Sequence, residues 1–156
     1  MVKNLIFTKN EIRFLRELVR HKVDFMIIGL SAAALQGAPV VTQDVDLWFA
    51  DLASTQLTKA LKKVKSIYVP PMGNNPPMFA GDDVQLFDIV THVHGLGEYA
   101  EVKKEAIKIS LDDFKVPVLP LELIIKSKQA AGRKKDKLVL PVLKDVLKTI
   151  RSSEKG

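Results

Sequence analysis

The chain has 156 residues and no cysteine, and its 24 Lys and Arg outnumber its 18 Asp and Glu to give a net charge of +6. This length suits a single domain over residues 1–156, and the lack of cysteine excludes disulfides, thiolate chemistry and cysteine-based zinc sites. The positive charge favours nucleotides or RNA as partners. The first ten residues, MVKNLIFTKN, contain no apolar signal segment, so we expect a cytoplasmic protein.

An amphipathic helix is predicted from Thr8 to about His21. Thr8 and Glu11 have the spacing of a capping box, in which each side chain accepts a hydrogen bond from the backbone of the other residue. Apolar residues recur at helical spacing between Ile12 and Val19. This helix therefore has one apolar face with which to pack on a sheet.

The stretch FMIIGLSAAALQGAPVVTQDVDLWF, residues 25–49, predicts a strand, a short helix and a second strand. Four apolar residues end at Gly29, an alanine-rich segment follows as far as Gly37, and the second strand runs on to Phe49. The nearly uncharged part, 25–41, is shorter than the roughly 20 residues of a membrane span and is broken by glycine and proline. We therefore expect no membrane association.

Two carboxylates lie in the second of these strands, at Asp44 and Asp46. Residues two apart in a strand point to the same face, with Cα atoms about 6.6 Å apart. Paired carboxylates in a half-buried place repel each other unless a cation compensates them, and Mg²⁺ (or Mn²⁺) is the natural candidate because it prefers hard oxygen ligands. The alternative is a strand end at which both aspartates meet solvent.

Gly29, where the first strand ends and the short helix begins, predicts an anion site. The free N–H groups and the positive dipole end of a helix attract phosphate, and glycine allows the backbone to turn and a phosphate to approach closely. Ser31 could add a hydroxyl donor at the same place.

A second helix is predicted after the carboxylate strand, with a lysine-rich face that we interpret as solvated rather than as a nucleic-acid contact. A short strand over 66–69 and a proline-rich loop over 70–77 follow. We expect Met78–Ala80 and Val84–Val90 to pair as a hairpin. Asp88 would then lie among buried neighbours and be paired or metal-bound, as a third carboxylate beside Asp44 and Asp46.

His92 and His94 alternate in the loop after this strand, but no further His or Cys with zinc-site spacing accompanies them. A role for His92 near bound phosphates stays open. Two strands are expected at the edge of the sheet, over 106–110 and 114–119, the second interrupted by proline. Two helices then close the chain, the first of them ending at Gly132.

Taken together, these segments resemble the nucleotidyltransferase superfamily that includes DNA polymerase beta, and most closely its minimal members related to AbiEii-type toxins and MNT-like antitoxins. The family pattern is a strand, a glycine turn, a helix ending near glycine and then Asp-hydrophobic-Asp. Gly29, Gly37 and Asp44-Val45-Asp46 fall on this pattern, and Asp88 falls where the family has its third carboxylate. The segment LELIIKSKQAAGRKKD, 121–136, is similar to the family's lysine-rich helix and Gly-Arg-x-Lys-Asp segment.

The resemblance implies a nucleotidyltransferase fold, an α/β (α+β) architecture with a mixed sheet of about five strands and helices packed on it. It implies Mg²⁺-dependent transfer of a nucleoside monophosphate from an NTP to an acceptor hydroxyl on RNA, protein or a small molecule, with a place in a toxin–antitoxin system as one setting. The residues then take the following roles: Asp44, Asp46 and Asp88 as catalytic metal ligands, and Gly29, Ser31, Lys128 and Arg133 as the nucleotide-binding set.

Leu30 stands where this group usually has Gly or Ser, and a bulky side chain there hinders the approach of a triphosphate unless it turns into the core. The competing prediction is therefore a non-catalytic member of the same fold, either a nucleotide-binding protein or an antitoxin-like one. The minimal length leaves no separate acceptor-binding domain, so an enzyme of this size is expected to need a partner protein or a homodimer.

Overall fold

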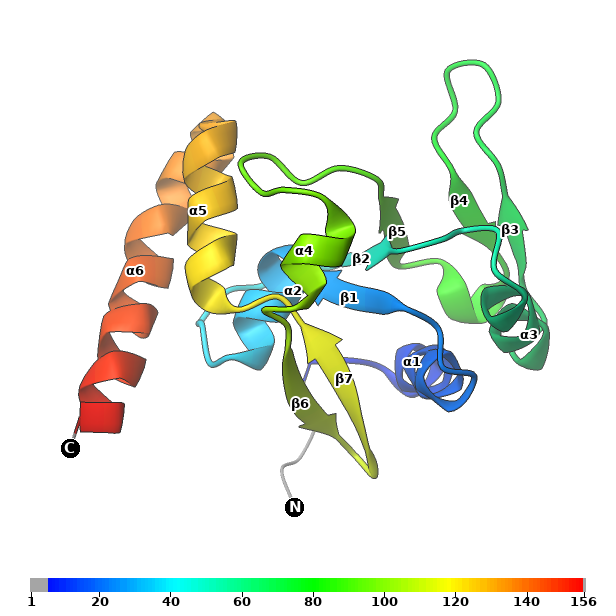
Figure 1. The fold of residues 1–156 in the computed structure, drawn as a ribbon, viewed down its shortest axis with the longest axis horizontal. Coiled ribbons are helices and arrows are strands. Elements are labelled where there is room, and N and C mark those ends of the chain that lie inside the picture. The colour runs from blue at the N-terminus through cyan, green and yellow to red at the C-terminus, as the bar shows by residue number, and fades with distance from the viewer. Residues whose placement is uncertain (1–5, 156) are drawn as a thin grey trace.

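The computed structural model describes residues 6–155, so the first residues, on which the predicted location depends, lie partly outside this range. The helices are α1 (Lys9–Arg20), α2 (Gly29–Leu35), α3 (Thr55–Lys63), α4 (Tyr99–Lys103), α5 (Leu121–Ala131) and α6 (Lys134–Lys155), with a short 3-10 helix, η1 (Asp82–Val84). The strands are β1 (Phe25–Ile28), β2 (Val45–Phe49), β3 (Ile67–Val69), β4 (Met78–Ala80), β5 (Phe87–Val90), β6 (Ile107–Leu111) and β7 (Phe114–Val118). Figure 1 shows their arrangement.

Five strands form one mixed sheet in the order β5-β2-β1-β7-β6, which confirms the predicted architecture. β1 runs antiparallel to β2 and parallel to β7, and β2 runs parallel to β5. β3 and β4 form a separate two-stranded sheet whose loop projects away from the rest of the chain (Figure 1). The sheet order places the strand that carries Asp46 next to the strand that carries Asp88.

The predicted hairpin between Met78–Ala80 and Val84–Val90 is wrong. β4 pairs with β3 instead, η1 follows it, and β5 begins only at Phe87. The proline-rich loop is the turn of the β3–β4 hairpin, and Gly81 then brings the chain so close to Ser66 that a Cβ would lie 2.0 Å from its hydroxyl oxygen. Glycine is therefore needed at this position, where β4 ends beside the start of β3.

The prediction that both late strands lie at the sheet edge is also wrong for β7, which lies between β1 and β6. Proline is tolerated there because β1 pairs with β7 at Val118, one residue beyond Pro117. The backbone N–H of Leu119 then donates to the carbonyl oxygen of Ile27 at 2.9 Å. Pro117 is paired with Lys108 in the register of β6 and β7.

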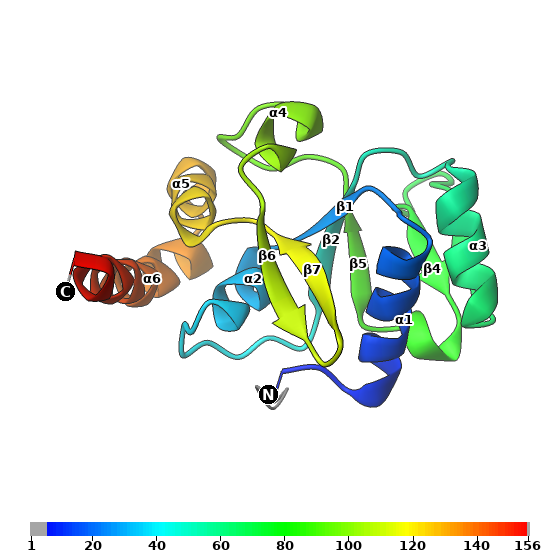
Figure 2. The ribbon, with the colours of Figure 1, turned by 60° about the horizontal axis from the view of Figure 1, so that its bottom comes forward.

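The predicted capping box at the start of α1 is confirmed. Glu11 accepts a hydrogen bond from the backbone of Thr8 at 2.8 Å, and Thr8 accepts one from the backbone of Glu11 at 3.2 Å. α1 packs against α3 and β7 and buries Phe14 completely (Figure 2). The ring of Phe14 meets Phe79 and Phe87 edge to face, with centroids 5.5 and 5.0 Å apart, and so fixes the start of β5.

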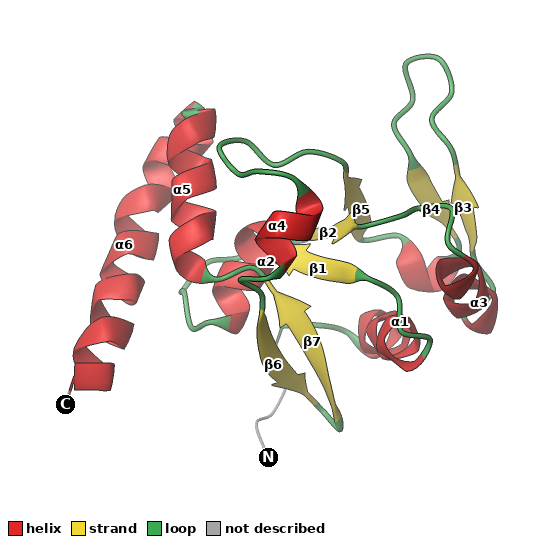
Figure 3. Cartoon of the chain, in the orientation of Figure 1, coloured by secondary structure: helices red, strands yellow, loops and turns green. Residues whose placement is uncertain are grey.

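α5 and α6 stand together on one side of the sheet, with α1 and α3 on the other (Figure 3). α5 ends at Gly132, which has the left-handed conformation (φ 61°) that favours glycine, as predicted. α6 packs on α5, and Leu143 of α6 is fully buried. Among the described residues, no helix combines the length and the hydrophobicity that crossing a membrane would require.

Candidate active site

Asp46 and Asp88 lie directly opposite each other on the parallel strands β2 and β5. Asp44 precedes β2 by one residue, and all three carboxylates line one pocket of about 260 Å³. The other residues that line this acidic pocket are Leu30, Thr42, Lys128, Lys135, Asp136 and Val139. The structure therefore brings together the three acids that the sequence singled out, from two neighbouring strands.

Two of the three carboxylates, Asp46 and Asp88, have a raised pKa. Burial together with repulsion from Asp88 and Asp44 raises the pKa of Asp46 to about 6, although Lys128 opposes this. Burial and then repulsion from Asp44 raise the pKa of Asp88. Asp88 is exposed as a residue, so the expectation that it lies among buried neighbours is wrong, because β5 starts only one residue before it. Negative charge in this pocket is only partly compensated by the protein.

Gly29 is required by the geometry around Asp46. Its φ of 68° is in the left-handed region, and a Cβ at this position would lie 2.7 Å from Oδ2 of Asp46. The register explains the contact, because Ile28, the last residue of β1, pairs with Asp46. The turn into α2 thus allows the carboxylate to rest against the backbone.

Ser31 does not reach the pockets that contain Asp46. It is 1% exposed, and its hydroxyl donates to the backbone carbonyl oxygen of Asp44 at 3.0 Å. Thr42 donates to the same oxygen at 2.9 Å. Ser31 was expected to bind phosphate, but it sits one residue further into α2 than the turn and points at the chain that carries Asp44.

Leu30 lies between Gly29 and Ser31 in the chain, and its partly buried side chain lines the acidic pocket. A bulky apolar wall stands there in place of the small residue of the family pattern. The pocket keeps its volume of about 260 Å³ with this side chain in place.

A second pocket, also of about 260 Å³, adjoins the first and shares Asp46 and Lys128 with it. Its other lining residues include Gly29, Ser127 and Arg133, the apolar Val90, Leu119 and Ile124, and the two histidines of the β5–α4 loop. The rings of His92 and His94 meet edge to face with centroids 5.4 Å apart. No role was predicted for His94, since alternating histidines in a loop without further zinc ligands carry little signal.

The β5–α4 loop that carries both histidines rests directly on α5. Gly95 (φ 75°) lies so close to this helix that a Cβ would be 2.5 Å from the Cβ of Ala130. Glycine is needed there because any side chain would push the loop off the helix. The loop thereby connects the strand of Asp88 with the helix of Lys128.

Lys128 and Arg133 reach the site from α5 and from the turn that follows it. Both pair with Asp136 of α6, Lys128 at 3.4 Å and Arg133 at 2.8 Å. Sequence reasoning did not select Asp136. The signal it offered was an acid in the first turn of a helix, just after Gly132, within an otherwise basic segment.

The donor set fits Mg²⁺ or Mn²⁺ by its chemistry, since carboxylate oxygens from one or two residues commonly hold Mg²⁺ together with substrate phosphates and water. Within residues 6–155, no group of three or more His, Cys, Asp or Glu side chains is already arranged to hold a metal ion. Asp44 and Asp46 with phosphate oxygens would therefore be the holding set, and Asp88 lies in the same pocket.

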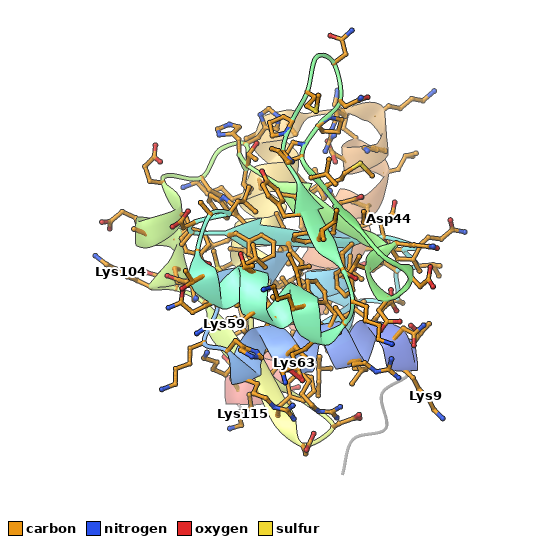
Figure 4. The ribbon with its side chains drawn as sticks, turned by 90° about the vertical axis from the view of Figure 1, so that its right-hand side faces the viewer. Lys9, Asp44, Lys59, Lys63, Lys104 and Lys115 are labelled. Atoms are coloured by element: carbon orange, nitrogen blue, oxygen red, sulfur yellow. The ribbon has the colours of Figure 1, made fainter. Side chains whose placement is uncertain are left out.

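The lysine-rich face of α3 contributes no residue to either of these two pockets. Lys59, Lys62 and Lys63 are exposed on this helix, and Figure 4 shows Lys59 and Lys63 on its outer surface, apart from Asp44. This agrees with a solvated face.

Comparison with solved structures identifies the fold. A candidate nucleotidyltransferase from Thermotoga maritima superimposes with a TM-score of 0.57 at 18% identity, over 83% of this chain and 86% of that one. ANT(2'')-Ia in complex with adenylyl-2''-tobramycin gives 0.56 at 14% identity, over 91% and 95%. An antigenic nucleotidyltransferase-like protein from Paracoccidioides brasiliensis gives 0.59 at 19% identity, over 92% and 78%.

No protein-family model matches the sequence, and neither does any curated protein. The protein has the nucleotidyltransferase fold, as the resemblance in the sequence implied. The acidic pocket lies at the β2–β5 edge of that fold.

Proposed function

We propose that the protein is a nucleotidyltransferase that transfers a nucleoside monophosphate from an NTP to an acceptor hydroxyl. One observation carries the proposal: Asp46 and Asp88 lie in register on adjacent parallel strands and share a pocket with Asp44 and with Lys128. Three carboxylates that repel one another, with the ammonium of Lys128 beside them, suit a site for metal-assisted phosphoryl transfer. ANT(2'')-Ia, a neighbour in fold, has a crystal structure in complex with adenylyl-2''-tobramycin.

The nucleotide is assigned to the boundary of the two pockets. Lys128 and Arg133 offer the cations that a triphosphate needs, and Gly29 leaves room for a phosphate beside Asp46. A Mg²⁺ or Mn²⁺ ion held by Asp44 and Asp46 would neutralise phosphate charge when bound. The second pocket, with two imidazoles, a serine hydroxyl and apolar walls, has the character of a base or sugar site.

The transfer forms one bond and breaks one. The acceptor oxygen attacks the α-phosphorus, the bond from that phosphorus to the bridging oxygen breaks, and pyrophosphate leaves with the electron pair. The proton of the acceptor hydroxyl goes to Asp88, whose raised pKa makes it a better proton acceptor than an ordinary aspartate. Lys128 and Arg133 stabilise the charge that develops on pyrophosphate.

A direct assay tests the proposal. The protein is incubated with each α-labelled NTP, with Mg²⁺ or Mn²⁺, and with three acceptors: total RNA, the protein itself and a mixture of small polyols and amino sugars. Asp46→Asn and Asp88→Asn should lower the rate of transfer by about 100- to 1,000-fold, as loss of a transition-state electrostatic contact does. Asp82→Asn, an exposed acid ahead of β5, is the matched control and should keep the parent rate. Equal transfer by the parent and both site variants would refute the proposal.

A second candidate, favoured by Leu30 in the wall of the acidic pocket, is a non-catalytic member of the fold that binds a nucleotide and acts on a partner. Its setting would be an antitoxin-like role or a complex with another protein or a second copy. It predicts NTP binding in calorimetry with no label transferred to any acceptor. Label transfer by the parent chain separates the two, and Leu30→Gly should raise transfer in either case if the leucine obstructs the triphosphate.

A further inference from the structure

Asp136 carries a carboxylate that is withdrawn from solvent, with its side chain 1% exposed. Burial of an uncompensated charge is strongly unfavourable, so such a group must be paired and hydrogen-bonded. Arg133 supplies three hydrogen bonds: from its backbone nitrogen at 3.1 Å, from Nε at 2.8 Å and from a terminal guanidinium nitrogen at 3.3 Å. The ammonium of Lys128 lies 3.4 Å from Oδ1 of the same carboxylate.

The chain is shaped to make this cluster. Gly132 ends α5 in the left-handed conformation, Arg133 lies between the helices, and Asp136 falls in the first turn of α6. An acid in this turn bonds back to the free N–H before the helix and interacts favourably with the helix dipole. One carboxylate therefore joins the end of α5, the connecting turn and the start of α6. We call Lys128, Arg133 and Asp136 the clamp.

The cations of the clamp face the site. Lys128 lines both pockets and Arg133 lines the second one, each in company with Asp46. The Lys128 side chain is only 17% exposed, so its ammonium has little room to move. Lys128 and Arg133 thus pair with Asp136 while they line pockets that also contain Asp46.

We propose that Asp136 is a positioning residue for polyphosphate: it holds the ammonium of Lys128 and the guanidinium of Arg133 at the boundary of the two pockets, where the phosphates of a nucleotide would meet them. The inference rests on the proposed function, because it assigns that site its phosphate-binding groups. Long cationic side chains lose rotamer freedom when they bind phosphate, and a group that orders them beforehand lowers this cost. Without Asp136 both cations would also be free to turn onto Asp46.

Binding of tripolyphosphate with equimolar Mg²⁺, measured by calorimetry, tests the inference without any transfer step. Asp136→Asn should weaken binding about tenfold. Asp145→Asn makes the same change at an exposed position of the same helix and should leave the dissociation constant within about twofold. In the Lys128→Ala background, Asp136→Asn should weaken binding by less than it does in the parent, because part of its effect acts through Lys128 and the rest through Arg133.

Three results would overturn the inference: a folded Asp136→Asn protein that binds as tightly as the parent, full additivity in the double variant, or a parent that does not bind tripolyphosphate. A purely structural role for Asp136 would lower the melting temperature without the dependence on Lys128. Circular dichroism and the melting temperature establish that each variant is folded at the temperature of the titration.

A measurement on the parent chain covers the case in which Asp136→Asn does not fold. In nitrogen-detected NMR of the side chains, Nζ of Lys128 and Nε of Arg133 should shift when Mg²⁺-tripolyphosphate is added, whereas Nζ of Lys144 on α6 should not. Unmoved signals from Lys128 and Arg133 would overturn the inference. Polyphosphate binding through the clamp with no nucleotide transfer would support the inference and refute catalysis, so the two proposals fail separately.

Discussion

The site has a sheet side and a helix side, and the two treat their charges differently. On the sheet side, burial and repulsion among the carboxylates raise the pKa of Asp46 and of Asp88, and the protein supplies too little positive charge to offset this. On the helix side, Asp136 is more deeply buried than any of these three, yet its pKa is lowered: burial acts against this, and the hydrogen bonds from Arg133 prevail.

The contrast separates a group that the fold satisfies from groups that it leaves unsatisfied. A buried acid that serves the structure is matched by partners within the chain, whereas uncompensated acids in a pocket are typical of sites at which a ligand supplies the missing charge. We therefore interpret the helix side as the part of the site whose charges are paired within the chain, and the sheet side as the part whose charge a ligand would compensate.

The sharpest test of this comparison is the same substitution on both sides. Asp136→Asn should lower the free energy of unfolding by about 3 kcal/mol at pH 7, because it leaves the clamp cations without their buried partner. Asp46→Asn should instead raise the melting temperature at pH 7 by a few degrees, since about 1 kcal/mol corresponds to roughly 2–4 °C in a chain of this size. Thermal unfolding followed by circular dichroism measures both.

The pH dependence of these two effects follows from the pKa shifts. The pKa of Asp46 rises from 3.8 to about 6 on folding, so the ionised group costs stability as pH rises through this range, and the gain from Asp46→Asn should vanish near pH 4. The pKa of Asp136 is lowered on folding, so its contribution is present above the unfolded value and is lost in acid. A loss of stability in both variants at pH 7 would contradict the comparison.

Gly29→Ala should disturb the position of the Asp46 carboxylate by a steric clash rather than by a change of charge. A positive φ and a Cβ 2.7 Å from Asp46 Oδ2 predict a loss of about 1–3 kcal/mol in stability together with a displaced carboxylate and reduced transfer. Gly37→Ala is the matched control, because it also has a positive φ (99°) but no atom within 4 Å of the added Cβ. Urea unfolding of both variants measures the difference, and equal losses would show that the contact with Asp46 is unimportant.

The smallest loss of stability is expected from the hydrogen bonds to the backbone carbonyl oxygen of Asp44. Ser31→Ala removes a buried hydrogen bond to the carbonyl oxygen of Asp44 and should cost about 1 kcal/mol. Thr42→Val removes an exposed bond to the same oxygen and should cost less than half as much. Chemical denaturation ranks the two; a larger loss for Thr42→Val would contradict the role given to Ser31.

The path of the chain on the sheet side could be predicted from the sequence because the signals for it are local. A glycine turn, a small-residue helix and an Asp-x-Asp strand lie within 25 consecutive residues, so the path from β1 through α2 to β2 follows from the order of the residues. Asp88 was found by its type and place along the chain. Its exposure was misjudged, because the start of β5 depends on η1, and η1 is held by the packing of Val84 rather than by a repeating pattern.

The helix side was only half predicted, because its key contacts join residues whose pairing the spacing does not reveal. Lys128 and Arg133 were selected through a family resemblance, and their shared partner Asp136, the last residue of the same segment, was given no role. The pairing of β3 with β4 was missed for a related reason: strands of three residues carry almost no periodic signal from which to predict a partner.

Asp46 and Lys128 line both pockets, so a carboxylate and an ammonium lie at their boundary. A molecule long enough to occupy both cavities would place its middle, rather than either end, beside these two charges. For inhibitor design, this favours compounds with a charged, phosphate-like linker and two interchangeable end groups. Such compounds would tolerate wide variation at their ends and almost none at their centre.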